Sequence, residues 1–514
     1  MKPAELIVAV DVGTTAIKLA VLNREFDCLA EAAVPLKLSH PQPLWAEQDP
    51  EDWWQAVAAA MKLVQKSVPS LKTKAAALVF VAQMCGVVAV DKKGKPLRPC
   101  LTWLDKRAGS MIRARMAGVP RIAGYGLFKL LRSLRLTNGA PSLNGMDPVA
   151  KMIWLQAHEP DVWAKTHKLL DVRDWVVHRA TGKFITTADS ANLTWMMDSR
   201  RGGAEWSPQL LKLYGVPRQM LPDIVPGSAI AGELTEIAAR ALGLNVGLPV
   251  VAGSGDVFAA ALGSGAVDDG MLHISLGTSA WIGGFFPGRR FNVAASYATI
   301  AGAVNNRPLL IATQECAGAC LDWFSKVRGR KADALGFSPR ASMPMFLPWL
   351  AGERVPVDDN RLRAAFLGLS LEHDSDDMMA SVAEGIALNL RWAMNSVKKQ
   401  RGVVKGAALT VVGGAALNDG LCQIIADCLG QDLLRAPNPR FAGMRGAALM
   451  AAESLGWQAS AFEAAKALSS KGERRFIADP AKSAYYAKRF KLFEAAYRRL
   501  APWLRTYASQ MLHD

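Results

Sequence analysis

Apolar positions in this chain follow two different periods, and segments of the two kinds alternate from one end to the other. Runs of neighbouring apolar residues with β-branched side chains predict strands at 75–81, 87–90, 249–253 and 409–412. Segments with an apolar residue every three or four positions predict helices at 51–68, 147–155, 377–397 and 419–429. Strands that alternate with helices are typical of an α/β protein.

One distinctive pattern occurs twice. The segment 7–15 is an apolar run that ends in Gly-Thr-Thr, and a second apolar run follows at 17–22. The segment 272–279 ends in Gly-Thr-Ser and leads into the apolar residues 280–282. Each copy predicts a strand, a tight turn and a second strand. The repetition favours two domains of related design that face one another across a cleft.

The length of the chain agrees with two domains. Its 514 residues are more than one hydrophobic core usually serves. We expect an N-terminal domain at 1–254 and a C-terminal domain at 255–514. The boundary between them lies just after the predicted strand at 249–253. Aromatic and leucine residues at helical spacing in 481–512 predict a long helix that caps the second domain.

Composition indicates a soluble globular protein that stays in the cytoplasm. Hydrophobic residues make up 51% and charged residues 21%. Glu5 and Asp11 interrupt the apolar start, so it does not resemble a signal peptide. The longest apolar stretch, 75–90, is interrupted by Gln83 and is too short to span a bilayer. Seven cysteines without a C-x-x-C pair argue against a disulfide framework or a structural zinc site.

The net charge of +16 raises the question of nucleic acid as a partner. The basic residues are scattered, however, and no zinc-finger, helix-turn-helix or RNA-binding motif accompanies them. Attraction of anionic substrates such as nucleotides explains the charge equally well. We therefore expect small-molecule partners, and neither nucleic acid nor a membrane.

The first Gly-Thr turn carries residue types that suit a phosphate. Gly13, Thr14 and Thr15 expose backbone N–H groups and hydroxyls with little obstruction. Asp11 could hold Mg²⁺, and Lys18 could add positive charge beside the γ-phosphate. An ordinary hairpin is the alternative interpretation, and the second copy of the pattern favours phosphate binding.

The second copy supplies Gly277 and Thr278 as phosphate contacts. A further candidate follows the predicted strand 409–412, where Gly413 and Gly414 would let a flat ring approach the backbone. Asn418 could then bond an adenine edge. A Gly-Gly pair alone is more often a simple turn.

Asp256 is the candidate catalytic base. Glycines precede it in Gly253-Ser254-Gly255-Asp256, which leaves space for a substrate beside the carboxylate. An aspartate in such a stretch is often only a turn former. Its position shortly before the second phosphate turn favours the catalytic interpretation.

These motifs, in this order, resemble the FGGY family of carbohydrate kinases over nearly the whole chain. The resemblance implies two ribonuclease H-like domains of the actin and hexokinase type, with ATP and Mg²⁺ as cofactors. The stretches that resemble the xylulokinase branch of the family are 45–50, 103–107 and 346–356. The resemblance assigns the general base to Asp256, the magnesium site to Asp11 and a nucleotide-contacting helix to Gly318. It assigns sugar contacts to Gln83, Met84 and Cys85, with Trp103 and Asp105 beside them.

Two departures from the family pattern lie at the sugar site. Cys85 stands where xylulokinases usually carry His, and Val257 follows the base where they usually carry Asn. Both changes remove strong hydrogen-bonding groups. The expected reaction is phosphorylation of a ketopentose such as D-xylulose to its 5-phosphate. Because of these departures, another polyol or an autoinducer-2-like compound remains an alternative substrate.

A rival from another class is an actin- or chaperone-like ATPase that phosphorylates no small molecule. Such proteins share the paired phosphate turns, but they lack the segments around Gln83, Trp103 and Glu353. The sequence leaves the oligomeric state open, with a homodimer as one option.

Overall fold

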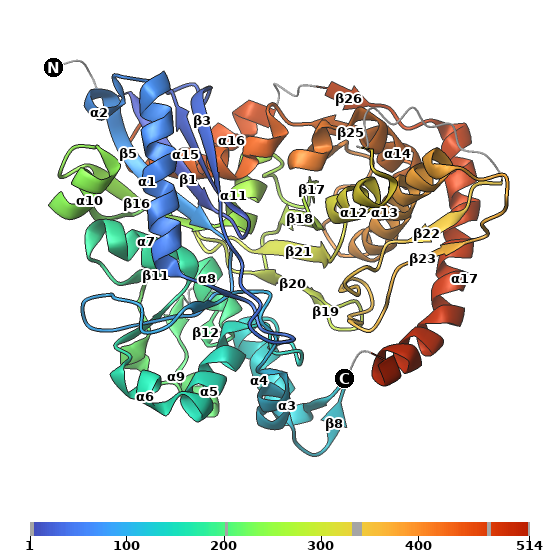
Figure 1. Cartoon of the computed structure of the whole chain (residues 1–514), viewed down its shortest axis with the longest axis horizontal. Coiled ribbons are helices and arrows are strands. Elements are labelled where there is room, and N and C mark those ends of the chain that lie inside the picture. Colours follow the sequence, from blue (N-terminus) through green and yellow to red (C-terminus); the bar gives the residue numbers. More distant parts are fainter. Residues whose placement is uncertain (1–4, 201–203, 331–341, 470–473, 512–514) are drawn as a thin grey trace. The chain divides into compact units, whose positions relative to one another are not determined.

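The structure is a computed structural model that describes residues 5–200, 204–330, 342–469 and 474–511. The chain forms two compact units (Figure 1). Unit 1 comprises residues 1–263, 300–308 and 443–464, and unit 2 comprises 264–299, 309–442 and 465–514. The change of unit therefore comes after Gly263, and two later segments return to unit 1. The expected functional division at 254 and 255 remains a prediction.

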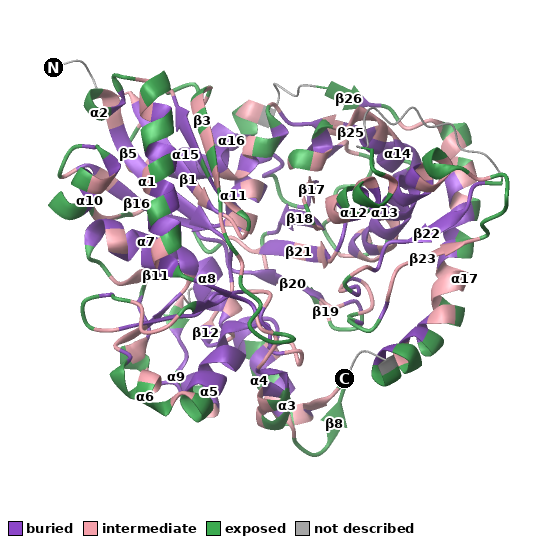
Figure 2. Ribbon diagram, in the orientation of Figure 1, coloured by how far each residue is buried: buried purple, intermediate pink, exposed green. Residues whose placement is uncertain are grey.

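Unit 1 is built on a six-stranded sheet with the strand order β15-β16-β5-β1-β2-β3. The strands β1, β5 and β16 are parallel neighbours, and β2, β3 and β15 run antiparallel to the strands beside them. Their bounds are β1 Leu6–Val12, β2 Ala16–Leu22, β3 Cys28–Pro35, β5 Ala75–Ala82, β15 Ile230–Glu233 and β16 Pro249–Gly255. The buried apolar runs of β1 and β5 explain why the sheet has helices on both faces (Figure 2).

The helices of unit 1 follow the predicted periodicity where a prediction existed. The segment predicted at 51–68 is a helix from Pro50 to Ser67, and Asp49 caps it by accepting a hydrogen bond from the Glu51 N–H at 3.0 Å. The helices are α1 Pro50–Ser67, α2 Leu71–Lys74, α3 Gly109–Met116, α4 Leu127–Thr137, α5 Pro148–His158, α6 Pro160–Lys165, α7 Val172–Thr181, α8 Ala188–Leu193, α9 Pro208–Tyr214, α10 Glu236–Leu242, α11 Asp256–Gly263 and α15 Ala442–Ser454.

Unit 2 has an eight-stranded sheet with the order β19-β20-β21-β18-β17-β24-β25-β26. The hairpin predicted at 272–282 forms strands β17 and β18, and β24 and β25 lie parallel beside β17. The bounds are β17 Leu272–Leu276, β18 Ala280–Phe285, β19 Phe291–Asn292, β20 Tyr297–Ile300, β21 Leu309–Gln314, β24 Leu409–Val412, β25 Leu433–Arg435 and β26 Arg474–Phe476. Both units thus contain a Gly-Thr hairpin beside parallel strands, which confirms the predicted α/β fold with two related domains.

The helices of unit 2 complete its core. The predicted C-terminal helix runs from Pro480 to Met511 and packs against α13 and α14, as expected for an element that caps this half. The helices are α12 Gly318–Arg328, α13 Ser375–Val397, α14 Asp419–Leu429 and α17 Pro480–Met511. Helix α16 Ala461–Ser469 begins in unit 1 and ends in unit 2. Among the described residues, no helix combines the length and apolarity that a bilayer crossing requires.

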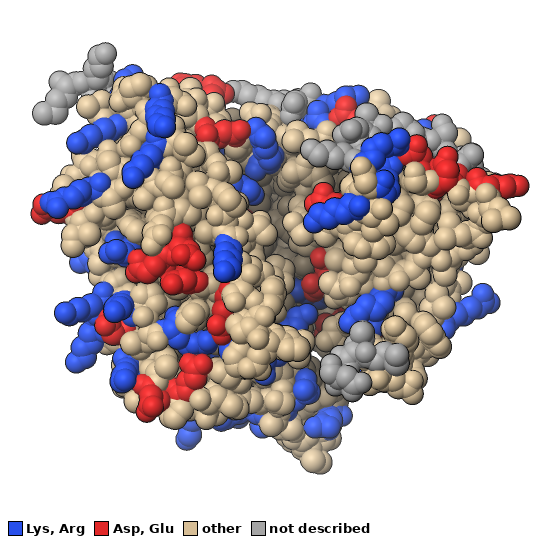
Figure 3. Space-filling view, viewed as in Figure 1, with Lys and Arg blue, Asp and Glu red and all other residues tan. Residues whose placement is uncertain are grey.

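Positively and negatively charged side chains are mixed on the face of the molecule in view. Lys and Arg side chains of the described residues are interspersed with Asp and Glu on that face (Figure 3). The excess of positive charge in the sequence therefore does not form a single basic stripe there.

Candidate active site

Three parallel strands bring the predicted residues of unit 1 to one edge of its sheet. In the register of the sheet, Gly255 at the end of β16 lies opposite Ala82 in β5, and Ala82 lies opposite Val12 in β1. The residues that follow these three are Asp256, Gln83 and Gly13. Since the carboxyl ends of parallel strands meet at one edge, segments far apart in the sequence form one site.

The hairpin between β1 and β2 forms the predicted phosphate turn. Asp11 pairs directly with Lys18 across the hairpin, and the Lys18 Nζ lies 3.8 Å from the Asp11 Oδ2. Within the turn, the Gly13 N–H donates to the Ala16 carbonyl at 3.2 Å. Thr14 is half-buried and Thr15 is exposed. The hairpin register thus brings together the predicted metal and phosphate residues.

The Thr14 hydroxyl ties the turn to the predicted sugar segment. It donates to the Gln83 Oε1 at 2.9 Å and accepts from the Trp103 Nε1 at 2.9 Å. The Gln83 amide also donates to the Gln48 Oε1 at 2.8 Å, and the Gln48 amide donates to the Thr14 carbonyl at 2.8 Å. Gln83 and Trp103 therefore hold the phosphate turn in place. Gln48 was missed as a site residue, although it lies in the 45–50 stretch on which the resemblance rested.

Asp105 has a supporting position behind this network. Its side chain is fully buried, and the carboxylate accepts from the Ala46 N–H at 2.8 Å and from the Arg107 guanidinium at 2.7 Å. Arg107 also pairs with Glu47 at 2.6 Å and stacks 3.5 Å from the centroid of the Trp45 ring. Because its carboxylate oxygens already accept these hydrogen bonds, Asp105 is better placed to position the 45–48 segment than to contact a sugar directly.

Asp256 begins helix α11 immediately after β16. The Gly255 N–H donates to the buried Asp189 Oδ2 at 2.8 Å, which fixes the backbone just before the base. A Cβ on Gly255 would lie 2.2 Å from the Met84 Sδ, so a side chain at this position would force Met84 to move. The sugar segment therefore packs directly against the residue that precedes Asp256.

The electrostatic setting of Asp256 suits a base that works near neutral pH. Burial raises the pKa of the Asp256 carboxyl to about 7, and the negative charge of Asp11 adds to the rise, while a hydrogen bond from the Val257 N–H opposes it. Burial also raises the pKa of Asp11, and the Lys18 ammonium opposes that rise. A base with a pKa near the working pH is the most effective in proton transfer.

Unit 2 brings three of its predicted nucleotide residues together. The N–H groups of Ala317 and Ala319 donate to the Thr278 carbonyl at 2.9 and 3.0 Å, and the Gly318 N–H donates to the Gly277 carbonyl at 2.9 Å. The start of helix α12 is thus bonded to the second Gly-Thr turn. A Cβ on Gly318 would lie 2.5 Å from the Gly277 oxygen, so the turn and helix approach as closely as glycine allows.

The predicted adenosine loop lies next to this turn. Gly413 has φ +97°, and a Cβ there would lie 2.3 Å from the Leu276 carbonyl at the end of β17. Gly414 is exposed, with open space where a side chain would begin. Asn418 caps α14 by accepting from the Leu421 N–H at 3.0 Å. Its predicted contact with adenine stays a prediction.

The residues present fit a magnesium ion shared with phosphate oxygens. Among the described residues, no group of three or more His, Cys, Asp or Glu side chains could hold a metal. Magnesium commonly takes only one or two carboxylates, with phosphates and water completing its shell. Asp11, half-buried at the phosphate turn and in the electrostatic field of Asp256, is such a carboxylate.

The paired Gly-Thr hairpins, each beside parallel strands, suit both sugar kinases and actin-like ATPases, and the family of the chain decides between these two classes. Residues 6–263 match the model of the FGGY family of carbohydrate kinases, N-terminal domain, and residues 272–455 match that of the C-terminal domain. The chain belongs to the FGGY family of carbohydrate kinases.

Individual relatives agree with this family. The chain is 30% identical to a xylulose kinase of Escherichia coli strain K12 over 506 residues, which cover 97% of this chain and 99% of the relative. Its fold is similar to a xylulose kinase from Lactobacillus acidophilus, with a TM-score of 0.85 and 23% identity over 96% of this chain and 98% of the other. A gluconate kinase from the same organism has a TM-score of 0.84 and 24% identity over the same shares. Structures with different sugar names thus share this fold, so the fold alone does not identify the sugar.

Proposed function

We propose that this sugar kinase transfers the γ-phosphoryl group of ATP to a hydroxyl of a ketopentose such as D-xylulose, giving the 5-phosphate. Asp256 is the general base. The observation that carries the proposal is the Asp256 carboxyl, with a pKa of about 7, at the same sheet edge as the phosphate turn and Gln83.

The chemistry needs a proton acceptor and groups that stabilise negative charge. Asp256 takes the proton of the substrate hydroxyl as the oxygen attacks phosphorus. Lys18 and the backbone N–H groups of the first turn stabilise the charge on the phosphoryl oxygens. When bound, Mg²⁺ would neutralise charge on the β- and γ-phosphates, and Asp11 would hold it.

The nucleotide contacts of the proposal lie in unit 2. The second turn and the start of helix α12 come together at Gly277, Thr278 and Gly318, where we place the phosphate contacts, and the open backbone at Gly414 leaves room for the adenine ring beside Asn418. These assignments rest on the local geometry and on the family pattern.

The base is tested with Asp256→Ala and Asp256→Asn in a coupled assay of ADP release. We expect sugar phosphorylation to fall by at least about 10²-fold, because general base catalysis contributes on the order of 10²–10⁴-fold. Binding of ATP, measured separately by calorimetry, should change little. Phosphorylation at a near wild-type rate in either variant would overturn the assignment.

The two departures from the family pattern test the sugar. Cys85 and Val257 offer weaker hydrogen bonding than the usual His and Asn, and a lost bond to a buried hydroxyl costs about 1–3 kcal/mol. We expect the double variant C85H/V257N to use D-xylulose with an efficiency about tenfold or more above the wild type. Cys85 has φ +65°, a conformation in which His is comparatively frequent, so the change suits the backbone.

A panel of ketoses, polyols, gluconate and autoinducer-2-type compounds decides between substrate classes. A compound other than D-xylulose that gives the highest kcat/KM in the wild type would replace the ketopentose in the proposal. ATP turnover that is independent of every added compound would instead favour the ATPase alternative.

A further inference from the structure

One peptide unit of the sugar segment is held at both ends by ionisable side chains. The Lys151 Nζ donates to the Cys85 carbonyl at 2.7 Å, and the N–H of the next residue, Gly86, donates to the Asp171 Oδ1 at 2.9 Å. The carbonyl and the N–H belong to the same peptide group. A lysine and an aspartate thus bind opposite ends of one peptide dipole, and such bonds are roughly twice as strong as those between neutral groups when the side chains are ionised. Burial raises the pKa of the Asp171 carboxyl to about 7.

We propose that Lys151 and Asp171 form a clamp that fixes the orientation of the Cys85–Gly86 peptide and so positions residue 85 for the substrate. The proposal rests on the proposed function, because it gives residue 85 a place at the sugar. Both clamp residues act through the backbone, so they are positioning residues rather than catalytic ones.

The backbone at this point needs such support. Cys85 has φ +65°, in the left-handed region that non-glycine residues seldom occupy unless their surroundings impose it. A Cβ on Gly86 would lie 2.7 Å from the Val172 Cγ2 and 3.2 Å from the Asp171 Oδ1. The start of helix α7 is therefore packed directly against the clamped peptide, which leaves no room for a side chain.

The position of Lys151 is unusual enough to require an explanation. The side chain is fully buried within helix α5, and burial lowers the pKa of its ammonium. Asp105 and Asp147 are its acidic neighbours, and their charges oppose that lowering. Its ammonium donates a hydrogen bond to a backbone carbonyl of the sugar segment. A costly buried cation whose hydrogen bond goes to that segment indicates a role in shaping it.

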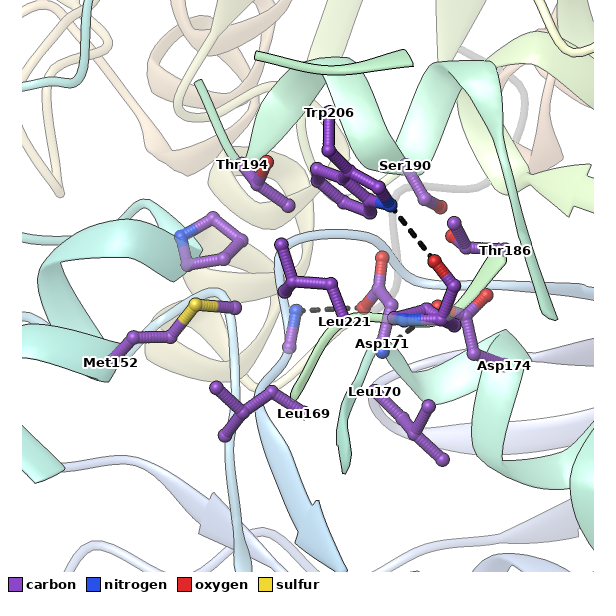
Figure 4. Close-up of a pocket in the computed structure, with 13 residues that line it drawn as sticks. Met152, Leu169, Leu170, Asp171, Asp174, Thr186, Ser190, Thr194, Trp206 and Leu221 are labelled. Carbon is purple, nitrogen blue, oxygen red and sulfur yellow. Dashed lines mark hydrogen bonds between the residues drawn. The ribbon is translucent and has the colours of Figure 1, made fainter. Parts of the chain in front are cut away.

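The opposite side of the clamp is closed to a sugar. Asp171 lies beside Asp174, Thr186 and Ser190 at a cavity of about 20 Å³, where a dashed line marks the bond that it accepts (Figure 4). That volume suits one water molecule, whereas small-molecule sites enclose roughly 300–1,000 Å³. A sugar therefore does not fit in the cavity beside Asp171.

The first test compares Lys151→Met with Ile153→Ala on the same helix. Methionine keeps the volume of the buried chain but donates no hydrogen bond, and Ile153 is a buried apolar residue of the adjacent core. We expect K151M to raise the sugar KM about 10- to 100-fold while the ATP KM stays within about twofold. I153A should lower stability without changing the sugar KM. An unchanged sugar KM in folded K151M overturns the proposal.

The other end of the clamp offers a matched pair, D171A and D171N. The asparagine retains an acceptor oxygen for the Gly86 N–H, and the alanine does not. We expect the sugar KM to rise at least about tenfold in D171A and less than about threefold in D171N. Equal effects of the two substitutions would show that the Gly86 bond is irrelevant, and would contradict the clamp.

A readout that needs no turnover separates the clamp from the proposed function. Hydrogen exchange by mass spectrometry on a peptide covering 83–90 reports the Gly86 amide in the sugar-free protein. We expect about one additional deuteron at early times in D171A and in K151M, and none in I153A. If no sugar is phosphorylated by the wild type, the proposed function fails and this exchange result still decides whether the clamp exists.

A double-mutant cycle with Cys85→Gly tests why the clamp is needed. Glycine adopts positive φ without strain, so the Cys85–Gly86 peptide no longer depends on the clamp to hold that conformation. The exchange increase caused by K151M should then be at least about threefold smaller in C85G than in the wild-type background. An equal increase in both backgrounds contradicts a role in holding the strained residue.

Discussion

At the scale of single residues, the position of Asp256 implies a definite pH dependence. Burial and the Asp11 charge raise the pKa of its carboxyl to about 7, and only the ionised form can accept a proton. We expect kcat/KM to fall about tenfold per pH unit below pH ~7 and to level off above it. The measurement is a pH profile with the coupling enzymes in excess at every pH. A flat profile between about pH 5.5 and 7.5 would contradict this setting of the base.

The same raised pKa predicts that Asp256 destabilises the folded protein at alkaline pH. Between its ordinary pKa and about 7, the folded state binds the proton more tightly than the unfolded state, so the contribution of this group to stability falls as pH rises. Asp256→Asn should therefore raise the melting temperature at about pH 8.5, by about 1–2 °C for each kcal/mol of penalty removed in a protein of this size. The gain should shrink toward pH ~4. A gain that is equal at both pH values would come from another cause.

Thr14 carries a further prediction at this scale, because its hydroxyl links three segments. Thr14→Val keeps the shape but leaves the Gln83 oxygen and the Trp103 N–H without this partner. An unmade bond to a buried group costs about 1–3 kcal/mol. We expect a lower melting temperature and a KM for ATP raised about tenfold. Thr14→Ser retains the hydroxyl and serves as the control, so equal effects of the two changes would exclude the hydrogen bonds as the cause.

Single residues also show where sequence reasoning ends. The turn residues Asp11, Thr14 and Lys18 were identifiable, because glycine, hydroxyl and charge fall within a few positions along the chain. Gln48 and Lys151 were not identifiable, because their hydrogen-bond partners are distant in the sequence. The partner of Gln48 is 34 positions away, and that of Lys151 is 66 positions away. Nothing in the local pattern around a buried lysine distinguishes it from a solvated one.

At the scale of elements, helix α12 and the second Gly-Thr turn of unit 2 approach each other closely. In Gly318→Ala the new Cβ would lie 2.5 Å from the Gly277 carbonyl oxygen, which is backbone and must shift. We expect the KM for ATP to rise about tenfold or more, because a displacement near 1 Å in a positioning element can cost on the order of 10²-fold. The KM for the sugar should stay within about twofold.

The matched control for that change is Gly443→Ala in helix α15, where nothing lies within 4 Å of a new Cβ. It should leave both KM values unchanged and should not reduce stability, since alanine favours helices. An unchanged KM for ATP in Gly318→Ala would remove Gly318 from the nucleotide site.

Elements were the most predictable level of this structure. The helices expected at 51–68 and 419–429 occur at Pro50–Ser67 and Asp419–Leu429, because apolar spacing and caps such as Asp49 and Asn418 act within a few residues. The order of strands in each sheet was beyond the same reasoning. Apolar runs in β1, β5 and β16 show that the strands are buried, but they do not show which strands are neighbours.

At the scale of the whole molecule, unit 1 is completed by a segment from late in the chain. Helix α15 packs against α11, the helix that begins with Asp256, so closely that a Cβ on Gly446 would lie 1.9 Å from the Ala259 carbonyl oxygen. Arg24 lies 4.5 Å from the centroid of the Trp457 ring in the same unit. Residues 443–464 therefore pack as part of unit 1, and we expect the fold of the first 263 residues to depend on them.

This packing predicts how fragments will behave. A fragment of residues 1–263 lacks the helix that covers α11, so it should expose apolar surface and melt with low cooperativity. A fusion of 1–263 to 443–464 through a flexible linker should regain a cooperative transition, followed by circular dichroism. The same fusion with Gly446→Val should lose it, because no side chain fits against Ala259. If the fragment 1–263 melts as cooperatively as the fusion, residues 443–464 are not needed for the fold of unit 1. The position of Asp256 would then depend on the sheet of unit 1 alone.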